Sequence, residues 1–452
     1  MQLTIEKLIY GGDGLARFVT PDEPGQAKKQ KKDQRGKAVF IPFVLPGEQV
    51  EARAVEEKPG FVRATLEKVL TPSPQRIAPL CPYFQRCGGC HYQHTEYANQ
   101  LAIKRQILSE TLERTAKIKW EGEIHLHPSP PWGYRNRTRM KITVEPFALG
   151  YHWHNSHDLL PVESCPISSP LINRAIAAIW EMGRGGGFAG YPLSEIEFFA
   201  GHADAELLLE LYAEKPLPEE SWQKLAENLR ARLPAITSLS ILSRAKHTRP
   251  EMQCEPSAKV EYSLQPEAFI YEAGSVRYQV SPGSFFQTNR FLVHPLIEVV
   301  CADAKGKLAL DLYAGVGLFS APLARTFDRV EAVEIAPSSF ADLRKNVPRN
   351  VRAHCATTLE YFKTAPTPGN LDLVVVDPPR AGLGNEVSRK LAALAPARVT
   401  YVSCDPATLA RDLAVFLQSG YAIAQIHLLD LFPQTFHIET VVHLSRRRPP
   451  ER

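Results

Sequence analysis

The segment Leu308-Ala-Leu-Asp-Leu-Tyr-Ala-Gly-Val-Gly317 decides the fold of this chain. In it a short apolar run is followed by a turn with two glycines, and a helical stretch begins after the turn. Three similar apolar runs follow at 330–334, 371–377 and 399–404, and helical stretches separate them. Apolar strands that alternate with helices are typical of a parallel, doubly wound sheet. We therefore expect a Rossmann-like C-terminal domain over residues 281–452.

The turn after the first strand predicts a nucleotide-type cofactor site, because ligands of such sheets bind at the carboxyl ends of the strands. Gly315 and Gly317 allow the backbone to approach a ligand closely. Glu334 ends the next strand, at a spacing from which an acid can accept hydrogen bonds from ribose hydroxyls. Phe319 and Ser320 stand where a dinucleotide site would have its third glycine. A nucleoside without a pyrophosphate is therefore favoured, and S-adenosylmethionine fits.

Asp377-Pro-Pro-Arg380 follows the third strand. Two prolines fix the backbone of this loop and remove its donors, so Asp377 and Arg380 are expected to face a planar, hydrogen-bonding ligand. The alternative is a rigid turn with a surface arginine.

Cys404 lies between the fourth strand and a helix that begins near Pro406. The positive end of a helix lowers the pKa of a thiol, so we expect Cys404 to be largely thiolate. A lone cysteine is more often a buried structural residue. The position of Cys404 at a strand's carboxyl end, beside a cofactor loop, favours a nucleophile instead.

The segment Leu428–Glu439 joins two apolar runs, 422–429 and 440–444, which we expect to pair antiparallel at the edge of the sheet. Their connecting loop brings Asp430, His437 and Glu439 together. An ordinary polar hairpin is the alternative for this segment.

A thiol and a carboxylate in one site are the groups that methylation of uracil at C5 requires. C5 of uracil is too weakly nucleophilic to accept a methyl group, but attack of a thiolate on C6 makes C5 nucleophilic, and a base must later remove the C5 proton. This predicts Cys404 as the nucleophile and Glu439 as the general base, with His437 as the next candidate. Arg380 and Asp377 would orient the ring and stabilise its charge. The target uracil would have to leave its stack in the RNA to be reached.

Residues 1–70 contain short strands separated by turns, which predicts a small OB-like β-barrel of the kind that holds single-stranded nucleic acid. The Lys/Gln-rich stretch 21–36 is expected to be a disordered loop of this barrel. Residues 75–280 mix strand-like and helical segments and form an expected central α+β domain. It carries a crowded set of cysteines at 81, 87 and 90, with another at 165. Four thiolates predict a metal site, and spacing leaves zinc and iron–sulfur open.

The composition of the 452 residues is that of a soluble globular protein, with 44% hydrophobic and 23% charged residues. Eight cysteines at uneven spacing do not suit a disulfide framework. The net charge of +4 says little about partners, although basic residues cluster at 28–37 and 446–448. The chain starts without a charged-then-apolar leader, and no apolar run approaches the roughly 18 residues of a membrane span. We expect a cytoplasmic protein without membrane association, and a monomer.

These motifs resemble the RNA uracil-C5 methyltransferase family, which includes 23S ribosomal RNA and transfer RNA members. Residues 403–412 look like the family's nucleophile motif, residues 430–439 look like its closing signature, and the resemblance covers nearly the whole chain. It implies a TRAM domain for the N-terminal barrel, an RNA partner, and S-adenosylmethionine contacts at Gln287, Tyr313, Glu334 and Asp377.

Cys81, Cys87, Cys90 and Cys165 are similar to the [4Fe–4S] ligand set of the ribosomal-RNA subgroup. The resemblance implies a structural or RNA-positioning cluster, and it favours 23S rRNA over tRNA. Radical-type S-adenosylmethionine enzymes use Cys-x3-Cys-x2-Cys, which differs. The chain departs from the family at 355–360, where no acidic or amide residue follows a glycine, so an adenine contact at Thr357 is left open.

Two other functions compete with this hypothesis. DNA cytosine methyltransferases use the same thiol and carboxylate logic, but their nucleophile follows a proline, and here Ser403 precedes Cys404. A non-catalytic RNA-binding assembly factor would need only the barrel and the cysteines, and would not need Cys404, Glu439 and Gln287.

Overall fold

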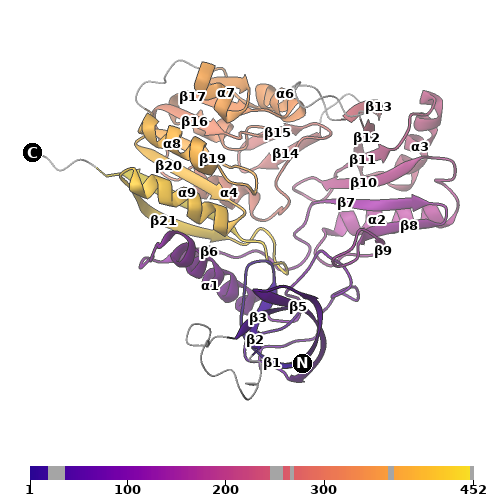
Figure 1. The fold of residues 1–452 in the computed structure, drawn as a ribbon. Coiled ribbons are helices and arrows are strands. Elements are labelled where there is room, and N and C mark those ends of the chain that lie inside the picture. The colour runs from indigo at the N-terminus through magenta and orange to yellow at the C-terminus, as the bar shows by residue number, and fades with distance from the viewer. Residues whose placement is uncertain (19–35, 245–257, 265–268, 365–370, 448–452) are drawn as a thin grey trace, which may run out of the picture.

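The computed structural model describes residues 1–18, 36–244, 258–264, 269–364 and 371–447. Figure 1 shows a small barrel, a middle sheet and a C-terminal sheet that is covered by helices. The Lys/Gln-rich stretch lies outside the described residues except for Gly36, and so do Cys254 and Arg448. No described helix is long and apolar enough to cross a membrane.

The N-terminal residues form a closed barrel with the strand order β1-β2-β3-β5-β4, as the sequence predicted. Side chains alternate along β1, so Leu3 and Ile5 point into the barrel core. At Gly14 an added Cβ would lie 2.3 Å from Cγ2 of Val44, so glycine is needed where the chain passes this close. The strands are β1 (Gln2–Leu8), β2 (Asp13–Phe18), β3 (Lys37–Pro42), β4 (Gln49–Glu57) and β5 (Phe61–Thr71).

The middle sheet has seven described strands in the order β13-β12-β11-β10-β7-β8-β9. It shares one apolar core with helices α2 (Pro170–Arg184) and α3 (Glu219–Arg232). The mixture of strands and helices expected for this region is therefore present. The strands are β7 (Arg137–Val144), β8 (Phe147–His152), β9 (Leu159–Pro161), β10 (Leu193–Ala200), β11 (Leu207–Ala213), β12 (Ile236–Arg244) and β13 (Ala258–Leu264).

The C-terminal sheet has the order β18-β17-β16-β19-β20-β22-β21-β6. The strands from β18 to β20 run parallel, and β22 lies antiparallel between β20 and β21. The four apolar runs predicted as parallel strands are β16, β17, β19 and β20. The strands are β16 (Gly306–Leu312), β17 (Phe327–Glu334), β18 (Val351–Cys355), β19 (Leu373–Val376), β20 (Arg398–Ser403), β21 (Tyr421–Leu429), β22 (Glu439–Arg446) and β6 (Ile124–His127).

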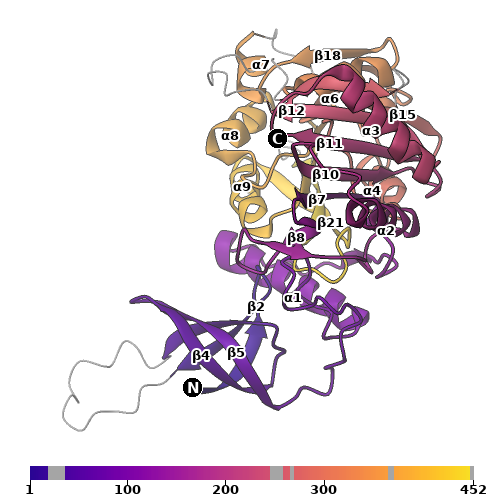
Figure 2. The same ribbon diagram turned by 90° about the vertical axis from the view of Figure 1, so that its right-hand side faces the viewer.

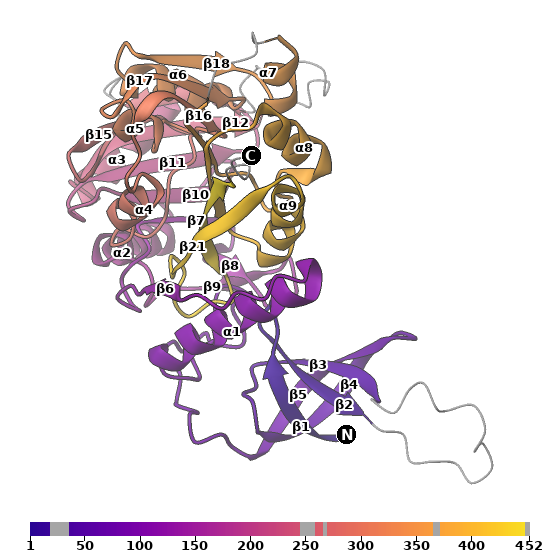
Figure 3. The same cartoon turned by 90° about the vertical axis from the view of Figure 1, so that its left-hand side faces the viewer.

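Helices cover both faces of this sheet (Figure 3). Alternate side chains of the central strands belong to two separate apolar cores, one on each face, which is why the strands read as continuous apolar runs. One face carries α4 (Val293–Val300), α5 (Ser320–Leu323) and α6 (Pro337–Asn346), together with the hairpin of β14 (Phe269–Ala273) and β15 (Val276–Val280). The other carries α7 (Thr358–Thr364), α8 (Gly384–Leu394) and α9 (Pro406–Gln418).

Two segments that precede the middle sheet pack on the C-terminal sheet. β6 pairs in parallel with β21 and forms the sheet edge. The antiparallel hairpin of β21 and β22 therefore exists as predicted, but it does not lie at the edge. Helix α1 (Tyr97–Ala116) packs against α9 and lies between the barrel and the C-terminal sheet (Figures 2 and 3). The barrel is thereby brought next to the strand ends where the site lies.

Candidate active site

One cavity of about 680 Å³ lies at the carboxyl ends of the strands of the C-terminal sheet. The loops after β16, β17, β19 and β20 meet there, because parallel strands end at the same edge. The loop before α4 and the loop before β22 complete the wall. The lining includes eight residues singled out from the sequence, namely Gln287, Tyr313, Glu334, Asp377, Arg380, Cys404, His437 and Glu439.

The loop after β16 is held in an unusual backbone shape. Tyr313, Gly315 and Gly317 all have positive φ, at 63°, 57° and 94°, a conformation that glycine adopts at little cost. Glu334 fixes this loop, since one carboxylate oxygen accepts the amide of Gly315 at 2.8 Å and the other accepts the amide of Ala336 at 2.6 Å. The carboxyl group of Glu334 is thus held in place where β16 and β17 end at the cavity.

The Asp377-Pro-Pro-Arg380 loop is tied to α9. Thr408 donates its hydroxyl to the carbonyl of Arg380 at 3.1 Å, and Arg411 donates to the carbonyl of Ala381 at 2.8 Å. The guanidinium of Arg380 is exposed at the cavity mouth, where its Nη2 lies 3.4 Å from Nδ1 of His437. The cavity therefore has a cation at its entrance and Asp377 behind it.

Cys404 lies at the end of β20 as predicted, but its thiol is not activated by the helix that follows. The carboxylate of Asp405 caps α9 by accepting the amides of Ala407 and Thr408 at 2.9 and 3.0 Å. Burial, followed by the charges of Glu439 and Asp377, raises the pKa of Cys404 to about 12, although Arg380 opposes the rise. The expectation of a resting thiolate was wrong, because a side chain already satisfies the helix amides and the thiol faces two carboxylates.

Glu439 begins β22 and is buried at the cavity wall. Burial raises the pKa of this carboxyl well above its usual range, and the charge of Asp377 raises it further. Burial also raises the pKa of Asp377. The two carboxyls therefore hold protons at a pH where exposed acids would have lost them, and a cation in the cavity would release those protons.

His437 is neutral in this setting. Burial and, after it, the charge of Arg380 lower the pKa of the imidazole to about 3. The ring packs against Phe436 and Phe432, with ring centroids 4.3 and 5.5 Å away. His437 can accept or donate a hydrogen bond, but it is poorly suited to take up a proton.

The loop that carries Glu439 is clamped by α1, which the sequence did not predict. Lys104 and Asp430 form a fully buried ion pair at 2.6 Å, and Lys104 also donates to the carbonyl of Phe432 at 2.9 Å. Gln100 and Gln434 exchange two hydrogen bonds of 2.9 Å. Asp430 was expected beside His437 and Glu439, and the structure gives it this clamping role in place of a position on the cavity wall.

The segment suspected of an adenine contact caps a helix. The amide of Thr357 donates to Oε2 of Glu360 at 2.9 Å, and the amide of Glu360 donates to Oγ1 of Thr357 at 3.2 Å. This is a capping box, which accounts for both residues at the start of α7. Several other residues line the cavity without having been singled out from the sequence, and two of them have side chains that can contact a ligand. They are Phe285, whose side chain is 64% exposed, and Arg135.

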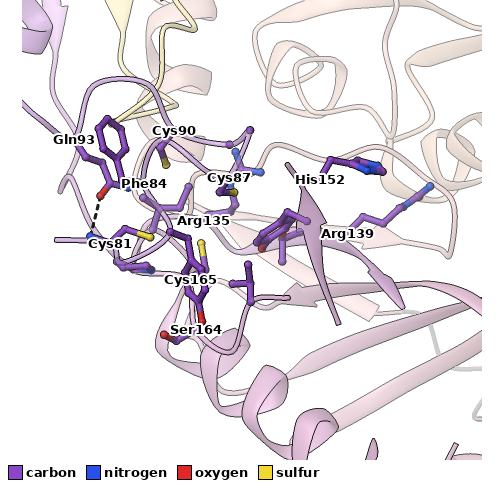
Figure 4. A pocket seen from close by; sticks show the side chains of 18 residues that line it. Cys81, Phe84, Cys87, Cys90, Gln93, Arg135, Arg139, His152, Ser164 and Cys165 are labelled. Atoms are coloured by element: carbon purple, nitrogen blue, oxygen red, sulfur yellow. Dashed lines mark hydrogen bonds between the residues drawn. The ribbon is translucent and has the colours of Figure 1, made fainter. Parts of the chain in front are cut away.

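The four clustered cysteines line a second cavity of about 450 Å³ (Figure 4). Cys81, Cys87 and Cys90 come from the loop before α1, and Cys165 comes from the loop before α2. Burial and, to a smaller extent, the charge of Cys165 raise the pKa of Cys87 to about 11 and that of Cys90 further. Arg135 lowers both pKa values. The fold thus brings the side chains of the four predicted cysteines to one cavity.

Arg135 lines both cavities. Its Nε is buried without a hydrogen-bond partner, and no described carboxylate lines the cysteine cavity. Within the described part of the chain, no three His, Cys, Asp or Glu side chains converge closely enough to hold a metal ion. The expected metal cluster is therefore not shown by the geometry.

The fold and the strand-end site are those of a class I methyltransferase domain. It is joined to a small β-barrel of a kind that commonly binds nucleic acid. The TRAM domain pattern matches residues 1–66, and the pattern described as tRNA (Uracil-5-)-methyltransferase matches residues 96–356 and 368–447. The chain belongs to this RNA uracil-C5 methyltransferase family.

Individual relatives span nearly the whole chain. An uncharacterized RNA methyltransferase of Aquifex aeolicus is 33% identical over 98% of each chain. The 23S rRNA (uracil(1939)-C(5))-methyltransferase of Klebsiella pneumoniae (strain 342) is 32% identical over 98% of this chain and 95% of its own. The fold is also that of the Pyrococcus abyssi tRNA (uracil-54, C5)-methyltransferase, with a TM-score of 0.72 at 24% identity over 98% of this chain and 100% of that one.

Proposed function

We propose that this protein methylates C5 of a uridine in 23S rRNA, with S-adenosylmethionine as the methyl donor. The observation that carries the proposal is one cavity that holds a thiol, two carboxylates with raised pKa values and the strand-end loop of a nucleoside site. Its volume of about 680 Å³ lies within the range of ligand and cofactor sites.

The residues on the β16 and β17 side of the cavity would hold the cofactor. When bound, S-adenosylmethionine supplies an electrophilic methyl group on a sulfonium. Glu334 is held by two backbone amides and keeps lone pairs that can accept the ribose hydroxyls. Tyr313, Gln287 and Asp377 line the same cavity, in keeping with the contacts that the family resemblance assigns to them.

Cys404 would attack the uracil ring. Its thiol proton passes to a neighbouring carboxylate, its Sγ forms a bond to C6, and the electrons of the C5–C6 double bond move toward O4. C5 then accepts the methyl group. The target base must leave its stack to reach this cavity, and the exposed Phe285 offers a ring at the entrance.

Glu439 would complete the reaction as the general base. It takes the proton from C5, the C5–C6 double bond forms again, and Sγ leaves C6. A carboxylate with a raised pKa suits this step, because a general base works best when its pKa lies near the working pH. Arg380, neutral His437 and Asp377 would orient the ring and balance the charge that develops on it.

We also propose that Cys81, Cys87, Cys90 and Cys165 hold a [4Fe–4S] cluster. The unpaired Nε of Arg135 and the lack of carboxylates in the lining fit a negatively charged thiolate cluster. The cluster would cross-link two loops and take no part in methyl transfer.

The choice of 23S rRNA rests on the relatives that span the chain at about 32% identity and on the four-cysteine site. Transfer RNA is the alternative. Mapping 5-methyluridine by mass spectrometry in rRNA and tRNA from cells with and without the gene tests both. We expect one 23S rRNA site to lose its methyl group. Loss confined to tRNA would refute the rRNA assignment, and no loss in either would refute the function.

A further inference from the structure

One tyrosine of the barrel contacts the backbone of Cys404, which lines the methyl-transfer cavity. Tyr10 lies in the turn between β1 and β2, where Gly11 and Gly12 have φ values of 108° and 95°. Its hydroxyl donates a hydrogen bond to the backbone carbonyl of Cys404 at 2.9 Å. The two residues are 394 positions apart in the sequence, so the contact depends on how the barrel docks.

The ring of Tyr10 packs against the loop that leads to Glu439. It lies edge-on to Phe436, with centroids 5.6 Å apart and planes at 89°. Phe436 precedes His437 in the loop that leads to Glu439, and it also packs against His91, at 4.6 Å between centroids. Tyr10 is therefore braced between the segment of the nucleophile and the segment of the general base.

The phenol keeps its proton in this position. Burial raises the pKa of Tyr10, and the charge of Asp405 raises it further. A protonated hydroxyl is a permanent donor, and a carbonyl can only accept. The hydrogen bond to Cys404 thus has one fixed direction over the working pH range.

We propose that Tyr10 is a positioning residue for methyl transfer, which fixes the backbone of Cys404 so that Sγ points at C6 of the bound uracil. The proposal rests on the proposed role of Cys404 as nucleophile. An error of about 1 Å in the placement of reacting groups can cost on the order of a hundredfold in rate. The barrel would then contribute to the chemical step as well as to RNA binding.

A tyrosine of the C-terminal sheet provides a matched control. The hydroxyl of Tyr421 donates to the backbone carbonyl of Pro396 at 2.8 Å, and this buried pair does not line the methyl-transfer cavity. Tyr421→Phe removes the same kind of bond as Tyr10→Phe. Any effect that comes only from lost stability should therefore appear in both variants.

The test compares Tyr10→Phe, Tyr421→Phe and the parent chain, each full length and with its native cofactors. Single-turnover methyl transfer is measured at saturating RNA and S-adenosylmethionine, and RNA affinity and melting temperature are measured separately. For Tyr10→Phe we expect a rate about tenfold lower, as for one lost hydrogen bond, with RNA affinity within about twofold. Tyr421→Phe should keep the parent rate. Tyr10→Leu, which also removes the ring, should be slower still.

Three results would overturn the proposal. They are a parent-like rate in Tyr10→Phe, an equal slowing in both phenylalanine variants, or weaker RNA binding with an unchanged saturated rate. Cys404→Ala separates this proposal from the function itself. If Cys404→Ala remains active, the proposed nucleophile is wrong. If Cys404→Ala is inactive and Tyr10→Phe is parent-like, only the role of Tyr10 is wrong.

Discussion

The two cavities that meet at Arg135 both contain buried thiols, and they differ in the charges beside those thiols. Cys404 is partly buried beside two carboxyls, and burial and the charges of these carboxyls raise its pKa. Burial raises the pKa of Cys87 and Cys90 as well, but the lining of their cavity has no described carboxylate, and Arg135 offsets part of the rise. A thiol beside acids can exchange protons during a reaction, whereas thiols beside a cation and away from acids are suited to lose their protons when a metal binds.

The largest expected effect is that of Cys404→Ala. Removal of the nucleophile should lower methyl transfer by at least about a thousandfold, because the uncatalysed ring is not nucleophilic at C5. RNA binding should be largely kept. Cys301→Ala, at a buried thiol that lines neither cavity, is the control and should remain active. Radiolabelled methyl incorporation measures both, and full activity of Cys404→Ala would contradict the mechanism.

Glu439→Gln should slow turnover by about a hundredfold or more, since general-base catalysis contributes on the order of 10²–10⁴. The reaction would stall after methyl transfer, so a protein–RNA adduct should accumulate and migrate as a slow band on a denaturing gel. If no adduct appears, the base lies elsewhere. His437→Gln would then be examined, although the low pKa of His437 argues against it.

Cys165→Ser should act on the other cavity. We expect loss of iron and of the brown absorbance near about 400 nm, with a melting temperature lower by about 5 °C or more because a bound group stabilises the folded state. Methyl transfer should fall by about tenfold, less than in Cys404→Ala. A colourless protein that contains zinc, purified without oxygen from the parent chain, would refute the iron–sulfur assignment.

The smallest effect is a pH dependence of cofactor binding. Burial and the charge of Asp377 raise the pKa of Glu439, and a bound sulfonium would lower the pKa of nearby carboxyls. Binding should therefore release protons, so S-adenosylmethionine should bind about fivefold more tightly at about pH 8 than at about pH 6. Calorimetry in buffers of different ionisation enthalpy measures this release. The pH dependence of binding should be weaker in Glu439→Gln, and also for the parent chain with S-adenosylhomocysteine, which lacks the sulfonium charge. If both cases showed the same pH dependence as S-adenosylmethionine binding to the parent chain, the electrostatic account would be contradicted.

Much of the strand-end site was predictable, because topology places the carboxyl ends of parallel strands at one edge. Glu334, Asp377 and Cys404 each end an apolar run, so the sequence alone brings them together. The protonation state of Cys404 was not predictable in this way. It depends first on the burial of the thiol and on the carboxyls beside it. The side chain of Asp405 also accepts the helix amides that would have stabilised a thiolate.

The parts that escaped prediction depend on docking between distant segments. Lys104 reads as a surface residue of an amphipathic helix, yet it is fully buried against Asp430. β6 is short and its neighbours in sequence are polar, so nothing local indicates that it pairs with β21. Tyr10 lies in an ordinary turn of the barrel, and only the packing of the barrel beside α9 gives it a contact with the backbone of Cys404.

The central claim is that Cys404 forms a covalent bond with the target uracil. It is tested most directly with RNA in which 5-fluorouridine replaces the target uridine, because Glu439 can remove a proton from C5 but no base can remove fluorine as a cation. After incubation with S-adenosylmethionine and nuclease digestion, peptide mass spectrometry should find the methylated fluorouridine on Cys404. A modified peptide elsewhere in the chain, or no adduct with RNA that binds normally, would contradict the claim.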